Sequence, residues 1–185
     1  MKSKTIAVLV GSLRKESITL KTAKALISFA PKSLTFEILD ISRLQHYNQD
    51  LEDSPPVEWA EFRQHLSGFD GVLFVTPEYN RSVPGVLKNA IDVGSRPKEK
   101  NAWSGKPAAV VSVAPGNLSG FGANHHLRQS LVYLDMPAMQ QPEAYIGGAA
   151  NLFDEKGNLI NDSTRDFMAN FIEAFAVWVA KITVQ

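Results

Sequence analysis

Three nearly uninterrupted runs of apolar residues are the clearest pattern in the chain. They cover residues 5–10, 71–76 and 107–114, and a turn containing glycine or proline follows each. Such runs are typical of strands that are covered on both faces, as in a parallel sheet. Residues 34–40 alternate between polar and apolar and predict a more exposed strand, and residues 138–146 predict a strand broken around Pro142.

Helical periodicity separates these strands. Apolar residues recur at helical spacing over about 18–29, 57–66, 84–92 and 124–136. A closing helix starts near Ser163, and one of its faces carries Phe167, Phe171, Ala174, Phe175, Trp178 and Val179. Residues 94–106 are polar and basic, and we expect them to form a surface connection. Strands and helices alternate along the whole chain, and this alternation predicts an α/β fold, a three-layer sandwich with a parallel sheet.

Composition narrows the chemistry more than the fold. The 185 residues suffice for one ordinary domain, and we expect a single domain over 1–185. The 19 basic and 19 acidic residues balance, so no general field favours nucleic acid or an anionic membrane. Cysteine is absent, which excludes disulfides, thiolate catalysis and cysteine-ligated metals. The first apolar run, residues 6–10, is too short for a signal peptide or a membrane span, so a cytoplasmic protein is expected.

The turn after the first strand carries phosphate-binding chemistry. Gly11 permits a tight turn, and the following helix offers unpaired N–H groups at its positive end. Hydroxyl and guanidinium donors lie on the same segment: Ser12, Arg14, Ser17 and Thr19. The glycines of a Walker A loop or a dinucleotide fingerprint are missing, which favours a single terminal phosphate. A serine-rich helix cap with a solvated Arg14–Lys15 pair fits the residues nearly as well.

Two further turns follow predicted strands. Glu78, Tyr79 and Asn80 offer an acceptor, an aromatic plate and an amide, which suit the edge and face of a planar heterocycle. An ordinary β–α connection, or a subunit contact through Tyr79, fits these residues equally. Gly116 and Gly120 let backbone approach a ligand, although turn geometry alone also explains them. Because the carboxyl ends of parallel strands lie along one edge, the three turns can face one ligand.

Histidine and serine provide no convincing centre of their own. His125 and His126 are neighbours on a predicted helix, so their side chains diverge by roughly 100° and make a poor metal pair. His46 and His65 have no partner at ligand spacing. A serine hydrolase is not indicated, because no G-x-S-x-G elbow surrounds Ser12 or Ser17. We therefore expect no metal site.

Two stretches together resemble a known family. Residues 11–17 (Gly-Ser-Leu-Arg-Lys-Glu-Ser) after the first strand and residues 76–92 (Thr-Pro-Glu-Tyr-Asn through Lys-Asn-Ala-Ile-Asp) after the third are similar to the NAD(P)H-dependent FMN reductases. This family includes bacterial chromate and quinone reductases and some azoreductases. The resemblance implies a flavodoxin-like sandwich with a five-stranded parallel sheet in the order 2-1-3-4-5. It also implies non-covalent FMN, with NAD(P)H as co-substrate and a quinone or similar small molecule as acceptor.

The resemblance also assigns residues to the cofactor. The phosphate maps to the first turn, with side chains and intervening backbone of Ser12, Leu13, Arg14, Lys15, Ser17, Ile18 and Thr19. The isoalloxazine ring maps to Pro77, Glu78, Tyr79 and Asn80 on one side and to the turn from Val113 to Gly116 on the other. Hydride transfer at the flavin N5 then needs no catalytic side chain. A homodimer or homotetramer is implied, with the helix that opens at Pro84 at the subunit contact.

Two other functions are compatible with this fold class. A flavodoxin-like electron carrier would bind FMN without reacting with NAD(P)H, but such carriers tend to be acidic for docking, whereas this chain is neutral. A receiver-type signalling domain needs acidic residues after the first and third strands. Gly11-Ser12 and Thr76-Pro77 occupy those places, so a signalling role is set aside.

Overall fold

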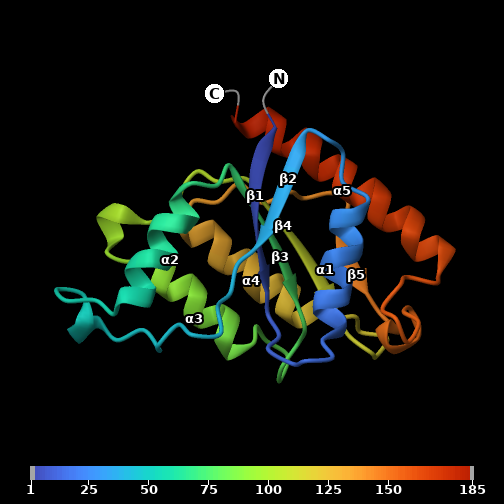
Figure 1. The fold of residues 1–185 in the computed structure, drawn as a ribbon, viewed down its shortest axis with the longest axis horizontal. Coiled ribbons are helices and arrows are strands. Elements are labelled where there is room, and N and C mark those ends of the chain that lie inside the picture. Colours follow the sequence, from blue (N-terminus) through green and yellow to red (C-terminus); the bar gives the residue numbers. More distant parts are fainter. Residues whose placement is uncertain (1–2, 184–185) are drawn as a thin grey trace.

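Five parallel strands form one central sheet in the order β2-β1-β3-β4-β5, as the resemblance implied. The structure is a computed structural model and describes residues 3–183. The strands are β1 Lys4–Val10, β2 Leu34–Ile38, β3 Gly71–Thr76, β4 Ala108–Val113 and β5 Ala144–Ile146. Their carboxyl ends all lie at the edge away from the two termini (Figure 1). Each strand therefore delivers its following loop to the same side of the molecule.

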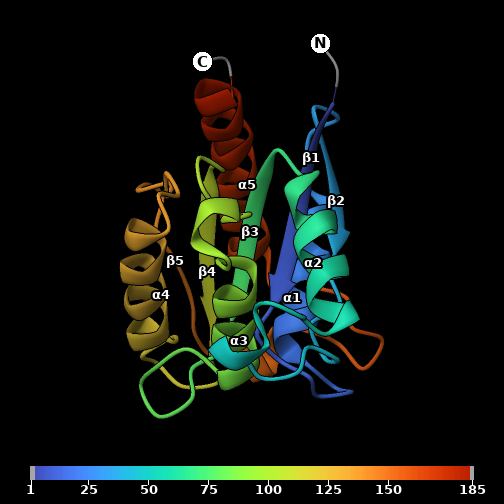
Figure 2. The ribbon, with the colours of Figure 1, turned by 90° about the vertical axis from the view of Figure 1, so that its left-hand side faces the viewer.

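Five helices cover the sheet on both faces. α1 Ile18–Ser28 and α5 Asp162–Thr183 lie on one face, and α2 Val57–Ser67, α3 Gly85–Gly94 and α4 Phe121–Tyr133 lie on the other (Figure 2). Alternate residues of β1 enter the two cores, with Ile6 and Val8 toward α1 and α5, and Ala7 and Leu9 toward the other three helices. The uninterrupted apolar runs are thus explained, because the central strands are buried on both faces.

Two elements, α4 and β5, differ most from their expected bounds. α4 begins at Phe121 and ends at Tyr133, three residues earlier at each end than predicted, because Gly120 starts it with φ of 74° and Asp135 stops it with φ of 59°. β5 is confined to Ala144–Ile146, and Ala138 makes only an isolated bridge to Ala108. Pro142, which has no N–H to donate, accounts for part of that shortening.

The expected surface connection at residues 94–106 is confirmed only in part, because its exposed residues, Lys98–Lys100 among them, surround a side chain that belongs to the core. Trp103 is fully buried there and packs against Phe74 and Phe62, with ring centroids 5.8 and 6.2 Å apart. Its indole N–H donates to the carbonyl of Ile91 at 3.0 Å. The polar and basic residues on either side hid this single anchor in the sequence.

Candidate functional site

Three loops meet at the carboxyl edge of the sheet, as predicted. We call residues 11–17 the first loop, 77–84 the second loop and 114–120 the third loop. The first two begin side by side, since the N–H of Gly11 donates to the carbonyl of Val75, one residue before the end of β3, at 2.9 Å. A Cβ on Gly11 would lie 3.1 Å from both Pro77 Cδ and Thr76 Oγ1. Glycine at this position lets the two loops approach each other.

The first loop ends in the capped N-terminus of α1. Ser17 occupies the N-cap and its hydroxyl oxygen accepts from the N–H of Leu20 at 3.1 Å. Ser17 and Thr19 are both buried, Ser12 and Ile18 are half-buried, and an exposed group comprises Leu13, Arg14 and Lys15. The guanidinium of Arg14 and the free amides of the first helical turn are donors suited to a phosphate. The structure thus shows Ser17 as the helix cap of one predicted alternative, and the phosphate site of the other stays a prediction.

The second loop contains a tight hairpin. Tyr79 and Ser82 exchange two backbone hydrogen bonds, of 3.0 and 2.9 Å. The two central residues, Asn80 and Arg81, have φ of 51° and 65°, which is the conformation that tight hairpins require and that side chains other than glycine adopt at a cost. Tyr79 is 51% exposed at this edge. An aromatic side chain is therefore presented outward on a fixed backbone, beside the first loop.

Glu78 does not point freely into the site. Its side chain is only 11% exposed. One carboxylate oxygen accepts from the N–H of Ala123 in α4 at 3.0 Å, and the other faces the guanidinium of Arg81 at 3.3 Å. The predicted acceptor for a heterocycle edge is thus already engaged within the protein, a contact that sequence reasoning missed. Pro77, next to it, is half-buried against Gly11.

The two glycines of the third loop differ in their surroundings. A Cβ on Gly120 would lie 2.9 Å from the Cβ of buried Ser112, so turn geometry and packing explain this glycine. A Cβ on Gly116 would meet nothing within 4 Å, and packing gives no reason for glycine there. Val113 ends β4 and is buried at the base of the loop. The hydroxyl of Ser112 holds the loop by donating to the carbonyl of Ser119 at 2.8 Å.

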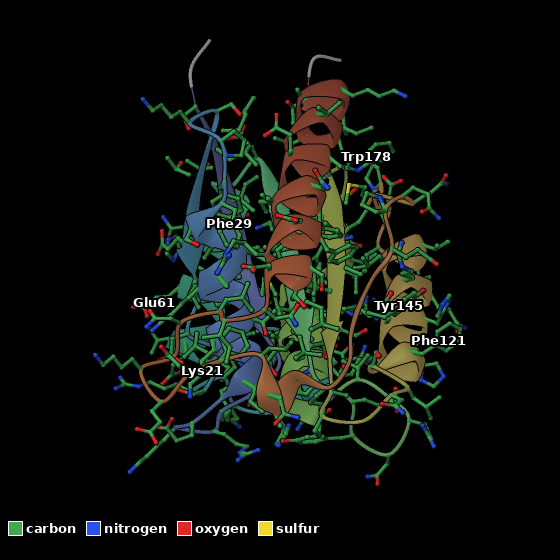
Figure 3. All side chains as sticks on the ribbon, turned by 90° about the vertical axis from the view of Figure 1, so that its right-hand side faces the viewer. Lys21, Phe29, Glu61, Phe121, Tyr145 and Trp178 are labelled. Carbon is green, nitrogen blue, oxygen red and sulfur yellow. The ribbon has the colours of Figure 1, made fainter. Side chains whose placement is uncertain are left out.

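The neighbouring histidines point to different partners, as expected from their spacing. His126 Nδ1 lies 2.9 Å from the hydroxyl of Ser82, in the second loop. His125 Nε2 lies 2.9 Å from the hydroxyl of Tyr145, and its ring packs against Phe121 (Figure 3 labels Phe121 and Tyr145 side by side). Burial, aided by a hydrogen bond to Glu143, raises the pKa of Tyr145 to about 12, so this phenol stays neutral at physiological pH.

A cavity of about 490 Å³ lies beside the second loop, between α3 and α4. Ser82 and His126 line it near the hairpin, and Arg96 and Tyr133 are among its other lining residues. Tyr133 and the adjacent Val132 are 72% and 79% exposed, large apolar side chains left uncovered on α4.

Among residues 3–183, no helix is long and apolar enough to span a membrane.

Known proteins resemble this chain over nearly its full length. The sequence model of a family described as NADPH-dependent FMN reductase matches residues 4–151. A quinone reductase from Pseudomonas putida is 62% identical over 176 residues, which cover 95% of this chain and 94% of that protein. A 2-hydroxy-1,4-benzoquinone reductase from Burkholderia sp is 43% identical over 174 residues, which cover 94% and 95% of the two chains.

The fold is also close to that of a solved structure. The flavoenzyme NAD(P)H:(acceptor) oxidoreductase FerB from Paracoccus denitrificans superposes with a TM-score of 0.90. The two sequences are 41% identical, and the match covers 96% of this chain and 98% of that one.

Proposed function

The chain belongs to the NADPH-dependent FMN reductase family, and we propose that it binds FMN non-covalently and uses NAD(P)H to reduce quinones or similar small acceptors. Relatives named for quinone reduction support this choice of acceptor. One structural observation carries the proposal. Gly11 lets the loop that suits a phosphate approach the loop that suits a planar ring, so both ends of one ligand would find partners at one edge.

The first loop would hold the phosphate end. The amides at the start of α1 and the hydroxyl of Ser12 supply neutral donors, and the helix end supplies positive potential. Arg14 adds a charged donor from an exposed position. Ser17 contributes by capping α1, which fixes the amides of the first turn. The backbone of Leu13, Lys15 and Ile18 would line the phosphate site, and buried Thr19 would support the first turn of α1 beneath it.

The second and third loops would enclose the ring end. Tyr79 and Asn80 lie on the rigid hairpin and would shape one side of the ring, with Pro77 at its base. Gly116 and the backbone after Val113 would approach from the other side, where no side chain intervenes. Bound FMN would supply the electron-transfer chemistry, and the protein would supply position and exclusion of water. We assign no acid or base to the chain.

The decisive experiment is the absorbance spectrum of purified protein, before and after addition of FMN. We expect a yellow protein whose colour bleaches with NAD(P)H in the absence of air and returns with benzoquinone. A protein that stays colourless and fails to bind added FMN would overturn the proposal. Binding of FMN without NAD(P)H oxidation would instead identify an electron carrier.

We further propose that residues 1–185 form a single FMN-binding domain that acts as a homodimer or homotetramer in the cytoplasm. The uncovered side chains of Val132 and Tyr133, beside the α3–α4 cavity, support a subunit contact on that face. Light scattering of the purified protein should give a mass at least twice the 20.3 kDa of the chain. A monomer over the working concentration range would refute the oligomer.

A further inference from the structure

α4 begins without a capping side chain of its own. Gly120 occupies the N-cap, and no side chain there accepts a hydrogen bond from the first turn. The first amides of a helix have no intrahelical partner, and an N-cap oxygen usually accepts from the second or third helical residue. Here the third residue, Ala123, donates instead to the carboxylate of Glu78, which is 45 residues earlier in the chain. The cap of α4 is therefore supplied by the second loop.

Charge and geometry both favour this long-range cap. A carboxylate is stabilised at the positive end of a helix, and the more so where solvent is largely excluded, as it is around Glu78. Arg81 lies against its other oxygen. The carboxylate is thus fixed in orientation by α4 on one side and by its own hairpin on the other.

Two more contacts fasten the hairpin to the same end of α4. A Cβ on Gly122 would lie 2.6 Å from the carbonyl oxygen of Arg81 and 3.0 Å from Glu78 Oε2, so only glycine lets the helix approach this closely. About one turn further along, His126 contacts the hydroxyl of Ser82. The hairpin is therefore attached before, at and after its tip.

The third loop rests on this same turn of α4. Gly120 packs on Ser112, whose hydroxyl holds the carbonyl of Ser119. Asn124, fully buried, donates to the carbonyl of Ala144 at 3.3 Å and faces the Ser112 hydroxyl at 3.4 Å. Both loops proposed to enclose the ring are thus connected to residues 120–124.

We propose that the first turn of α4, residues 120–124, is a common support for the second and third loops, and that Glu78 is the positioning residue that links them. By capping α4, Glu78 fixes the hairpin of Tyr79 and Asn80 relative to the third loop. Its carboxylate acts on the protein and does not bind the ring itself. The cofactor part of this inference rests on the proposed function, whereas the cap is a property of the protein alone.

The test compares Glu78→Ala with Glu78→Gln, and uses Glu173→Ala on the exposed face of α5 as the control. Amide hydrogen exchange of Ala123, followed by NMR in FMN-free protein, reads the cap. The dissociation constant of FMN and the visible circular dichroism of bound FMN read the loop position. We expect Glu78→Ala to accelerate Ala123 exchange and to weaken FMN binding, each about tenfold, which corresponds to roughly 1.4 kcal/mol. Glu78→Gln keeps an amide oxygen as acceptor and should restore most of both values.

Each of the other outcomes would refute a defined part of the proposal. Weaker FMN binding with unchanged Ala123 exchange would show that Glu78 contacts the ring directly, and faster exchange with unchanged FMN binding would show that the cap positions nothing. If wild-type protein binds no FMN, the proposed function and the positioning role both fall, while Ala123 exchange still reports on the cap. If Glu78→Ala does not fold, Gly122→Ala tests the same support, because its methyl group must displace the hairpin. It should weaken FMN binding at least tenfold, whereas Gly68→Ala, where a Cβ lies 3.4 Å from its nearest neighbour, should not.

Discussion

Gly116 and Gly120 lie in the same loop, and replacing each with alanine should produce opposite results. In Gly120→Ala the new side chain must adopt φ near 74° and lies 2.9 Å from the Cβ of buried Ser112. The left-handed conformation costs about 1–2 kcal/mol and the overpacking about 1–3 kcal/mol. Together they predict a loss of roughly 2–5 kcal/mol in the free energy of unfolding. For a domain of this size the melting temperature should fall by on the order of 10 °C.

In Gly116→Ala the new methyl group meets no protein atom within 4 Å. The free energy of unfolding of FMN-free protein should therefore stay within about 0.5 kcal/mol of the wild-type value. If the backbone of Gly116 approaches the ring as proposed, the methyl group will occupy part of that space. FMN binding should then weaken about tenfold, the effect of roughly 1.4 kcal/mol of overpacking.

The assays are thermal unfolding of FMN-free protein and titration of FMN fluorescence. A Gly120→Ala protein as stable as wild type would refute the packing argument for that glycine. A Gly116→Ala protein that binds FMN normally would show that the ring does not approach Gly116. Since the two substitutions are chemically identical, any difference between them comes from their places in the loop.

Two further predictions concern the opposite ends of the sheet. Arg14→Ala should weaken FMN binding by about 1.5–3 kcal/mol, the scale of a charge-assisted hydrogen bond, while Lys24→Ala on the exposed side of α1 leaves it unchanged; equal affinities in an FMN titration would remove Arg14 from the phosphate site. Asp70→Asn should destabilise the protein at neutral pH and flatten its loss of stability in acid. Burial raises the pKa of Asp70, but hydrogen bonds from Thr5 and Lys4 outweigh burial and hold that pKa below 3.8. Its stabilising contribution is therefore present above about pH 4 and lost as the pH falls through the lowered pKa. Urea unfolding between pH 2 and 7 tests this, and parallel pH profiles for the two proteins would contradict it.

The sequence predicted those features that depend on neighbouring residues or on simple topology. β1, β3 and β4 are buried on both faces, and in each case an uninterrupted apolar run predicted this burial. The meeting of three loops at one edge followed from parallel strands alone. Gly11 was placed in a tight turn, although its close approach to Pro77 became visible only in the structure.

The features that sequence reasoning missed are contacts between distant segments. Trp103 is buried because Gly94 leaves room for its indole, since a Cβ on Gly94 would lie 2.6 Å from Trp103 Nε1. No periodic pattern records a fit between two such residues. The partner of Glu78 likewise depends on where α4 packs. The hairpin at Asn80 had a weak local signal, because asparagine is among the residues that tolerate positive φ.

The long motif at residues 76–92 therefore contains residues of two kinds. Tyr79 is exposed at the edge of the sheet and available to a ligand. Asn89, in contrast, is only 7% exposed. Its amide nitrogen donates to the carbonyls of Leu44 and Gln45, and its amide oxygen accepts from the N–H of Tyr47, at 2.8–3.1 Å. Its polar side chain holds the loop after β2, just as Glu78 holds α4.

A motif can thus identify a family while much of its length serves architecture. Removing Asn89 would leave the N–H of Tyr47 and the carbonyl of Leu44 without their partner, while the carbonyl of Gln45 keeps the indole N–H of Trp59. The two unpaired groups cost stability wherever the cofactor lies. Removing the side chain of Tyr79, which is 51% exposed, should cost far less stability. Measuring the stability of FMN-free variants therefore separates the two kinds of residue. Substituting a residue that holds the fold together lowers the free energy of unfolding. Substituting a residue that only faces the ligand weakens FMN binding and leaves that free energy unchanged.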